Sequence, residues 1–199
     1  MTDAQSDTAF RILAFSGSAH SPSLNQRLVS LAARGARDAG AEVTLISLRD
    51  FPMPLYHAEV EAAGGLPEHA RRFKQLLIDH QGLLISSPEH NSSVTAVLKN
   101  ALDWASRSES GEPPLVAFAG KVAGLVSASP GALGGLRGLF HLREILMNIR
   151  VTVLPGMVAV SQAHNAFAED GSLKDAKQDA AVRAVGRAVA EVGSRIVGG

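Results

Sequence analysis

Polar residues are concentrated in three loops of the sequence, and the first of these has the composition of an anion-binding site. It reads Ser16-Gly17-Ser18-Ala19-His20-Ser21-Pro22-Ser23-Leu24-Asn25 and leads directly into a helical pattern. The N-terminus of a helix presents free N–H groups and a partial positive charge. Hydroxyl, imidazole and carboxamide groups placed there would give a phosphate many neutral donors and little fixed charge. The structural alternative is that Ser21 or Ser23 only caps the helix and that the other residues form a turn.

The second loop, Ser86-Ser87-Pro88-Glu89-His90-Asn91-Ser92-Ser93, follows an apolar run. Pro88 restricts the turn, and the backbone amides and carbonyls after it could bind the edge of a flat heterocycle. The alternative is a plain connection to the next helix, with Ser92 or Ser93 as its N-cap. Serines stand where a receiver domain would need a phosphoacceptor aspartate, which disfavours that class of protein.

Glycines distinguish the third loop, which covers residues 127–135. Gly131, Gly134 and Gly135 permit positive φ angles and a close approach of the backbone to a ligand. Alternatively, they let this loop pack tightly against the second loop. The sequence of this loop alone leaves both interpretations open.

Apolar periodicity places the loops between strands and helices. Short apolar runs predict strands at residues 11–15, 43–48, 83–85, 122–126 and 151–160. Helical spacing of apolar residues predicts helices at 24–39, 67–79, 94–105, 136–149 and around 182–196. The stretch 49–65, with its prolines and glycines, predicts a long loop.

Near-continuous apolar strands that alternate with helices indicate an α/β fold with a parallel sheet covered on both faces. Right-handed crossovers favour a doubly wound, five-stranded sheet in three layers. Ligands of such sheets bind beyond the carboxyl ends of the strands. The three polar loops follow strands one, three and four, so we expect them to meet there.

Composition excludes several other classes of protein. The chain has 199 residues, 19 basic and 19 acidic side chains and no cysteine. We expect one domain over residues 10–199, a disordered leader over residues 1–9, no nucleic-acid partner, no membrane span and a cytoplasmic location. The spacing of the seven histidines offers no helical metal-ligand pair. We expect His57, His69, His80, His141 and His164 to be surface or hydrogen-bonded core residues.

Together the three loops resemble those of the NAD(P)H-dependent FMN reductases, a flavodoxin-like family that includes quinone and chromate reductases and azoreductases. The matching patterns are S-G-S-x-x-x-x-S-x-N from Ser16, P-E-x-N-x-S-x-x-x-x-L-K-N-A-L-D-W from Pro88, and the glycines of the third loop. The resemblance covers roughly residues 11–165, and the Pro88–Trp104 pattern is its most specific part.

The resemblance implies non-covalent FMN, with NADPH or NADH as electron donor and a quinone, flavin, azo compound or metal oxyanion as small-molecule acceptor. The flavin would carry the chemistry, so no side chain is assigned as a catalytic acid or base, and no metal is expected. The residues implied around the phosphate and ribityl chain are Ser18, His20, Ser23, Leu24 and Asn25. Those implied beside the ring are Pro88, Glu89, His90, Asn91 and Ser129.

The resemblance also implies a homodimer or homotetramer, in which the helix from Val94 to Trp104 contributes to the interface. For Leu102 and Trp104, a place in the core is an equally good interpretation. The rivals to a reductase are an electron-carrier flavodoxin and a flavodoxin-like binding module without reductase activity.

Two histidines depart from the family pattern. His20 replaces the arginine usual in the first loop, and His90 replaces the tyrosine of P-E-Y-N. Arginine offers phosphate a permanent bidentate charge, whereas an imidazole with an ordinary pKa near 6.5 is mostly neutral at pH 7. We therefore expect FMN binding that is weaker and more pH-dependent than the pattern usually gives.

Overall fold

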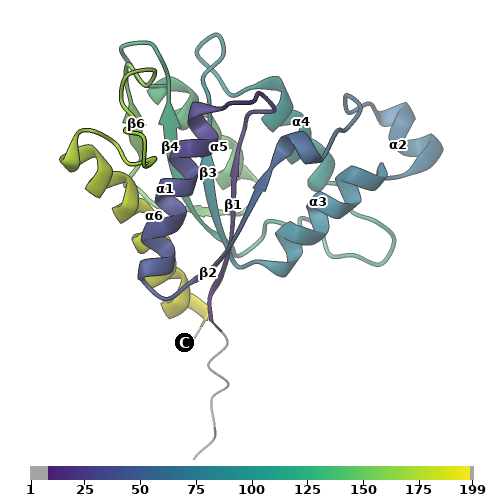
Figure 1. The fold of residues 1–199 in the computed structure, drawn as a ribbon. Helices are drawn as coiled ribbons and strands as arrows, with labels where there is room; N and C mark the ends of the chain where they lie inside the picture. The colour runs from purple at the N-terminus through teal and green to yellow at the C-terminus, as the bar shows by residue number, and fades with distance from the viewer. Residues whose placement is uncertain (1–8, 198–199) are drawn as a thin grey trace, which may run out of the picture.

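The computed structural model describes residues 9–197, which fold around a parallel sheet with helices on both faces (Figure 1). The strand order is β2-β1-β3-β4-β5. The first residues of β4 pair with β5, and its last residues pair with β6. Residues 1–8 of the predicted leader lie outside the described part of the chain. The strands are β1 (Arg11–Ser16), β2 (Glu42–Ser47), β3 (Gly82–Ser86), β4 (Val122–Ala128), β5 (Thr152–Val153) and β6 (Val158–Val160).

The sheet is buried on both faces because its central strands are apolar without alternation. In β1, Ile12 and Ala14 contribute to one core cluster, and Leu13 and Phe15 to the other. The first cluster lies under α1 (Leu24–Asp38) and α6 (Ala176–Val197), and the second under α3 (Glu68–Asp79), α4 (Ala96–Ala105) and α5 (Leu136–Asn148). This arrangement confirms the predicted doubly wound α/β fold.

Helices α1 and α6 cross with their backbones in close contact, and a glycine on each helix makes the contact possible. A Cβ on Gly35 would lie 2.1 Å from the Arg183 carbonyl oxygen, and one on Gly186 would lie 1.9 Å from the Ala32 carbonyl oxygen. Either distance is a severe overlap. The two glycines therefore set how closely the helices approach.

Three predicted boundaries were wrong. The expected strand 151–160 is broken into β5 and β6 by residues 154–157, where Pro155 has no N–H to donate to a ladder. The expected loop 49–65 contains a short 3-10 helix, η1 (Leu48–Asp50), and α2 (Ala58–Gly64), which buries no residue and so has no apolar period to detect. Helix α4 begins at Ala96, two residues later than expected.

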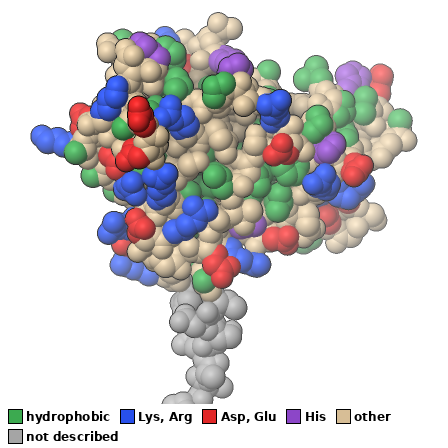
Figure 2. All heavy atoms as spheres, in the orientation of Figure 1, with side chains coloured by type: hydrophobic (Ala, Val, Ile, Leu, Met, Phe, Trp, Pro, Cys, Tyr) green, Lys and Arg blue, Asp and Glu red, His purple; other side chains and the backbone are tan. Residues whose placement is uncertain are grey.

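Charged side chains of both signs are interspersed over the face drawn in Figure 2. Within residues 9–197, no helix combines the length and the apolar character that crossing a membrane requires.

Candidate functional site

The three predicted loops meet at the carboxyl edge of the sheet and enclose a cavity of about 690 Å³. Its volume falls within the roughly 300–1,000 Å³ of small-molecule sites. Nine of the ten predicted site residues line it: Ser18, His20, Ser23, Leu24, Asn25, Pro88, Glu89, His90 and Ser129. Asn91 is not among the lining residues. The loops lie at the top of Figure 1, where strands β1, β3 and β4 end.

The first loop offers neutral donors at the start of α1. Ser23 caps this helix, and its Oγ accepts a hydrogen bond from the Gln26 N–H at 3.2 Å. The hydroxyl hydrogen remains available to a ligand, so capping and ligand binding are compatible. Within residues 9–197, the backbone N–H groups of Leu24 and Asn25 have no acceptor.

The Asn25 side chain joins three elements and is only 5% exposed. Its Nδ2 donates to the Ala128 carbonyl at 2.8 Å, and its Oδ1 accepts from the Ala128 N–H at 2.9 Å. The Ser86 hydroxyl also donates to Oδ1, at 2.8 Å. The amide of Asn25 therefore fixes α1 to the ends of β3 and β4, and it borders the cavity as a positioning group.

The second loop turns tightly away from the cavity at Asn91. Asn91 and Ser92 have φ angles of 50° and 68°, and His90 and Ser93 exchange two backbone hydrogen bonds of 3.0 Å. Two central residues with positive φ are typical of a type I′ turn. The turn explains why the side chain of Asn91 is outside the cavity lining while its neighbour His90 is inside.

Thr95 is the functional residue of this region that the sequence interpretation missed. It caps α4 by accepting from the Leu98 N–H at 3.1 Å, and its hydroxyl donates to the Gly17 carbonyl at 2.6 Å. Ser92 and Ser93 are therefore not the N-cap. A threonine directly before the Ala96-Val97-Leu98 run was the available signal. The other unpredicted lining residues are Gly17, Ala19, Pro22, Ala96, Val97, Ala128 and Pro130.

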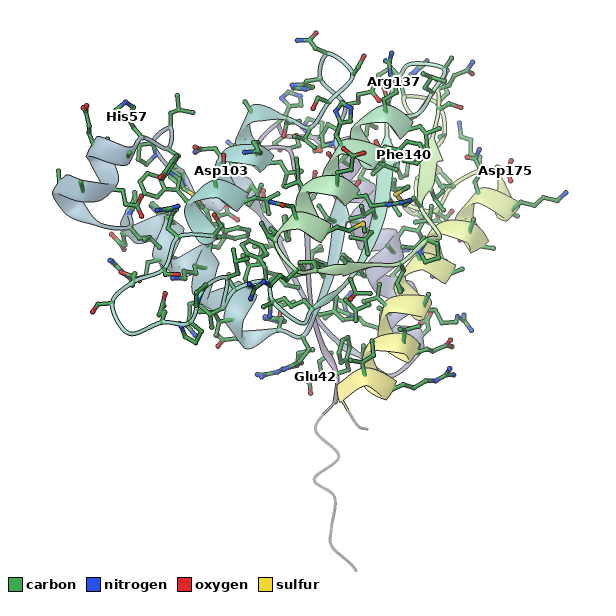
Figure 3. All side chains as sticks on the ribbon, turned by 180° about the vertical axis from the view of Figure 1, so that it is seen from behind. Glu42, His57, Asp103, Arg137, Phe140 and Asp175 are labelled. Carbon is green, nitrogen blue, oxygen red and sulfur yellow. The ribbon has the colours of Figure 1, made fainter. Side chains whose placement is uncertain are left out.

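Glu89 connects the second loop to the start of α5. Its carboxylate accepts from the Arg137 guanidinium, at 2.9 Å for Nε, and from the Gly138 N–H at 3.1 Å. Arg137 lies on α5 at the loop end of the molecule (Figure 3). Burial alone would raise the pKa of Glu89, but these hydrogen bonds outweigh burial and hold the pKa below its usual range. Glu89 therefore stays ionised near neutral pH and supplies the negative charge that the first turn of α5 lacks.

Two glycines of the third loop, Gly134 and Gly135, are required by close packing. Gly134 and Gly135 have φ angles of 63° and 92°. A Cβ on Gly135 would lie 1.9 Å from Ser127 Oγ, and one on Gly134 would lie 2.8 Å from the Ser161 nitrogen. Gly131 is not in the positive-φ region, and its N–H donates to Ser129 Oγ at 3.2 Å. The Ser129 hydroxyl hydrogen remains free to face the cavity.

The histidines outside the loops have ordinary structural surroundings. His80 is buried and contacts the Leu76 carbonyl at 2.6 Å and Thr44 Oγ1 at 2.7 Å. His141 contacts Ser93 Oγ at 3.0 Å, and His57 caps α2. His69 is the exception, since its Nδ1 is buried without a partner among the described residues. Within residues 9–197, no group of three or more acidic or histidine side chains could hold a metal ion.

A comparison with protein families decides what this combination of loops represents. The model of the NADPH-dependent FMN reductase family matches residues 10–165. The chain belongs to this family. It is an NAD(P)H-dependent oxidoreductase that uses FMN, as the resemblance of its motifs implied.

Relatives in sequence agree with this assignment, and a solved structure agrees with the fold. An NAD(P)H-dependent FMN reductase of Pseudomonas aeruginosa is 38% identical over 168 residues, which cover 84% of this chain and 86% of the relative. An NAD(P)H:quinone oxidoreductase of Solanum tuberosum is 32% identical over 180 residues, 88% of each chain. The flavoenzyme FerB of Paracoccus denitrificans, an NAD(P)H:acceptor oxidoreductase, superposes with a TM-score of 0.79 at 24% identity over 94% of this chain and 98% of its own.

The donor set of the cavity fits FMN. The free N–H groups of Leu24 and Asn25, together with the hydroxyls of Ser18 and Ser23, can surround a phosphate at the start of α1. His20 is the one residue of this loop that can add positive charge. The lining of the cavity continues past Pro88 and His90 to Ser129, so residues of all three loops border it.

Leu102 and Trp104 belong to the core. They are 1% and 0% exposed, and Trp104 Nε1 donates to the Pro54 carbonyl at 2.8 Å. On the described part of α4, the large apolar side chain that reaches the surface is Val97, at 37% exposure.

Proposed function

We propose that the cavity beyond β1, β3 and β4 holds FMN non-covalently and that the protein passes electrons from NADPH or NADH to a quinone. Free flavins, azo compounds and metal oxyanions are further acceptors within the same proposal. The observation that supports it is the meeting of all three polar loops around one cavity, although they are far apart in sequence. The name of the quinone-reducing relative supports the choice of acceptor.

In this proposal the first loop binds the phosphate and ribityl chain through Ser18, His20, Ser23 and Leu24. Asn25 holds the ends of β3 and β4 in register with this loop. When bound, FMN supplies the exchange of two electrons between the nicotinamide and the acceptor.

The second and third loops position the ring end of the cofactor. Pro88 and His90 border it, Glu89 anchors the loop to α5, and Ser129 offers its hydroxyl to the ring edge. Asn91 acts through the turn it forms rather than through its side chain. No side chain serves as a catalytic acid or base, because the reaction needs an open ring face rather than a nucleophile.

We further infer a homodimer or homotetramer in the cytoplasm. Exposed apolar side chains on α4 and α5 support self-association: Val97 on α4, and Leu136, Phe140 and Met147 on α5, of which Phe140 is visible in Figure 3. Sedimentation equilibrium of the wild-type protein and of Phe140→Asp tests the assembly. A wild-type monomer would contradict it.

The experiment that tests the function uses protein loaded with FMN, desalted and kept anaerobic. Its visible spectrum is recorded before and after addition of NADPH. Retained flavin that bleaches promptly supports the reductase. Retained flavin that does not bleach would indicate an electron carrier of the flavodoxin type. Protein that retains no flavin would indicate FMN bound loosely, as a substrate, or a cofactor site broken by His20.

A further inference from the structure

The first turn of α1 is held to the sheet by two consecutive side-chain amides that extend in opposite directions. Asn25 reaches the ends of β3 and β4 through the hydrogen bonds described above. Gln26 reaches β2, where its Nε2 donates to the Ile46 carbonyl at 3.0 Å. Because the strand order is β2-β1-β3-β4, the two amides hold this turn on both sides of β1.

Two buried polar atoms beneath this turn have no partner within residues 9–197. They are Ser16 Oγ and Gln26 Oε1. Ser16 is the last residue of β1 and is 0% exposed. An unpaired buried polar group destabilises a fold, and native structures pair nearly all such groups with protein or with ordered water. One shared partner would satisfy both atoms.

The strand register places these two atoms near each other. Side chains alternate along β1, and Ala14 belongs to the core cluster under α1 and α6, so Ser16 also faces α1. In the parallel register of β1 and β2, Ser16 pairs with Ser47, the residue after Ile46. The amide of Gln26, which is bound to the Ile46 carbonyl, therefore lies over the same strand ends as Ser16.

A water molecule suits this position. It can donate to Gln26 Oε1 and accept from the Ser16 hydroxyl, and a buried water typically makes about three hydrogen bonds. Ser47 offers the third, because paired residues of neighbouring strands point to the same face of a sheet. Ser47 Oγ accepts from the Arg49 N–H at 3.3 Å, which leaves its hydroxyl hydrogen available. The oxygen atoms of this set are neutral, which favours water over a metal ion.

We propose that Gln26, Ser16 and one water molecule buried between them position the first turn of α1 for the phosphate of the cofactor. This turn carries donors assigned to the phosphate, namely the N–H groups of Leu24 and Asn25 and the Ser23 hydroxyl. Gln26 is not among the residues that line the cavity, so it is a positioning residue that acts through the backbone of the turn. The inference rests on the proposed function, because it requires the phosphate end of FMN at the start of α1.

A comparison of two flavins tests the role of Gln26. FMN and riboflavin differ only in the phosphate, so the ratio of their Kd values reports on the phosphate site. Gln26→Met keeps a side chain of similar length and removes its hydrogen bonds. We expect it to raise the Kd for FMN about three- to tenfold, as the loss of one hydrogen bond would give, and to leave the Kd for riboflavin within about twofold. Gln75→Met, at an exposed position on α3, is the matched control and should change neither Kd.

Urea denaturation without any flavin tests whether Ser16 and Gln26 share a partner. Ser16→Ala removes a hydroxyl that is hydrogen-bonded in this proposal, so it should lower the midpoint of unfolding. The same change should have a smaller effect in Gln26→Met than in the wild-type protein, because the two residues bind one water. A midpoint that Ser16→Ala leaves unchanged or raises would mean that the hydroxyl is unpaired. Equal effects in both backgrounds would mean that the residues are independent, and either result would overturn the shared water.

Nuclear magnetic resonance distinguishes a water from a direct contact between the two side chains. In ¹⁵N-labelled wild-type protein, the side-chain amide of Gln26 should show a nuclear Overhauser effect to a long-lived water. Its absence would assign any coupling to a direct hydrogen bond between Ser16 and Gln26 and would overturn the water.

The flavin comparison also separates this inference from the proposed function. If the wild-type protein binds FMN no more tightly than riboflavin, the start of α1 binds no phosphate and both proposals fail. If the wild-type protein prefers FMN, and Gln26→Met is folded by its melting temperature but keeps the wild-type ratio of Kd values, only the role of Gln26 is wrong.

Discussion

The side chain of Asn25 pairs with the backbone of Ala128 in both directions, with donation to its carbonyl at 2.8 Å and acceptance from its N–H at 2.9 Å. The two residues are 103 positions apart in the sequence. Because a carbonyl only accepts and an N–H only donates, this pairing fixes which way the amide faces. It explains how a loop after β1 and a loop after β4 keep a common geometry around the cavity.

Removal of the Asn25 amide should lower the stability of the fold even when no ligand is bound. Asn25→Ala leaves the Ala128 N–H and carbonyl and the Ser86 hydroxyl buried without partners, and we expect a loss of about 2–4 kcal/mol in the free energy of unfolding. Urea denaturation measures the loss. Asn148→Ala, at an exposed position, is the control and should change stability by less than ~0.5 kcal/mol. A loss for Asn25→Ala no larger than that of the control would mean that the hydrogen bonds are not maintained in solution.

Replacement of His20 by arginine should strengthen FMN binding. A guanidinium offers a phosphate a permanent charge and two parallel donors, which an imidazole does not. We expect His20→Arg to bind FMN about tenfold more tightly at pH 8, as one charge-assisted hydrogen bond would give.

Quenching of FMN fluorescence during titration measures both affinities. The control, Ser21→Arg, adds the same charge at a neighbouring residue that does not line the cavity. Equal Kd values for the wild-type protein and His20→Arg would contradict the assigned role of His20.

Alanine at either glycine of the α1–α6 crossing should destabilise the protein, although alanine favours helices. A Cβ at Gly35 or Gly186 would overlap a carbonyl oxygen of the other helix, at 2.1 or 1.9 Å. Overpacking of this kind costs about 1–3 kcal/mol, more than the ~1 kcal/mol that alanine gains in helix propensity. Thermal unfolding should show a lower Tm for both variants. Gly64→Ala, which meets nothing within 4 Å, should be neutral or stabilising.

Much of this fold follows from local sequence patterns. The strands β1, β3 and β4 are apolar without alternation because helices cover both faces of the sheet. Their positions can therefore be predicted from continuous apolar runs in the sequence. Helix α2 was missed for the opposite reason: it buries nothing, and His57 and a Tyr56–Glu61 hydrogen bond of 2.9 Å hold it in place. Contacts of that kind depend on residues brought together by folding.

In the candidate site, too, local patterns predict position but not contacts. The loops at the strand ends predicted which residues would lie close together, because parallel strands end at one edge of the sheet. They could not predict what each side chain would do there. Asn25 and Glu89 use their polar atoms on the protein itself, and Asn91 turns out of the cavity because its φ angle is positive. These roles depend on the partner that each group meets across the loops.

Acid should weaken the fold through His80. Its Nδ1 faces the Leu76 carbonyl, so Nδ1 carries the hydrogen and Nε2 accepts from the Thr44 hydroxyl, which is the neutral form. Burial lowers the pKa of His80 below its usual 6.5. The unfolded chain therefore takes up a proton at a higher pH than the folded protein does. The stability contribution is complete above about pH 6.5 and is lost as the pH falls through the lower folded-state pKa.

Urea denaturation at pH 7.5 and pH 5.5 measures this loss, and we expect the wild-type protein to be less stable at pH 5.5. His80→Gln should be less stable overall but should lose less on acidification. An equal dependence on pH in the two proteins would assign the acid sensitivity to other groups.

The break between β5 and β6 also affects how the molecule behaves at high concentration. These two short strands pair with β4 alone and form one edge of the sheet. An uninterrupted edge strand would present a row of unpaired N–H and carbonyl groups on which a strand of another molecule could align and start an aggregate. Pro155 has no N–H, and residues 154–157 separate the two strands. The edge is therefore divided into segments of two and three residues, too short to act as a template for intermolecular sheet growth.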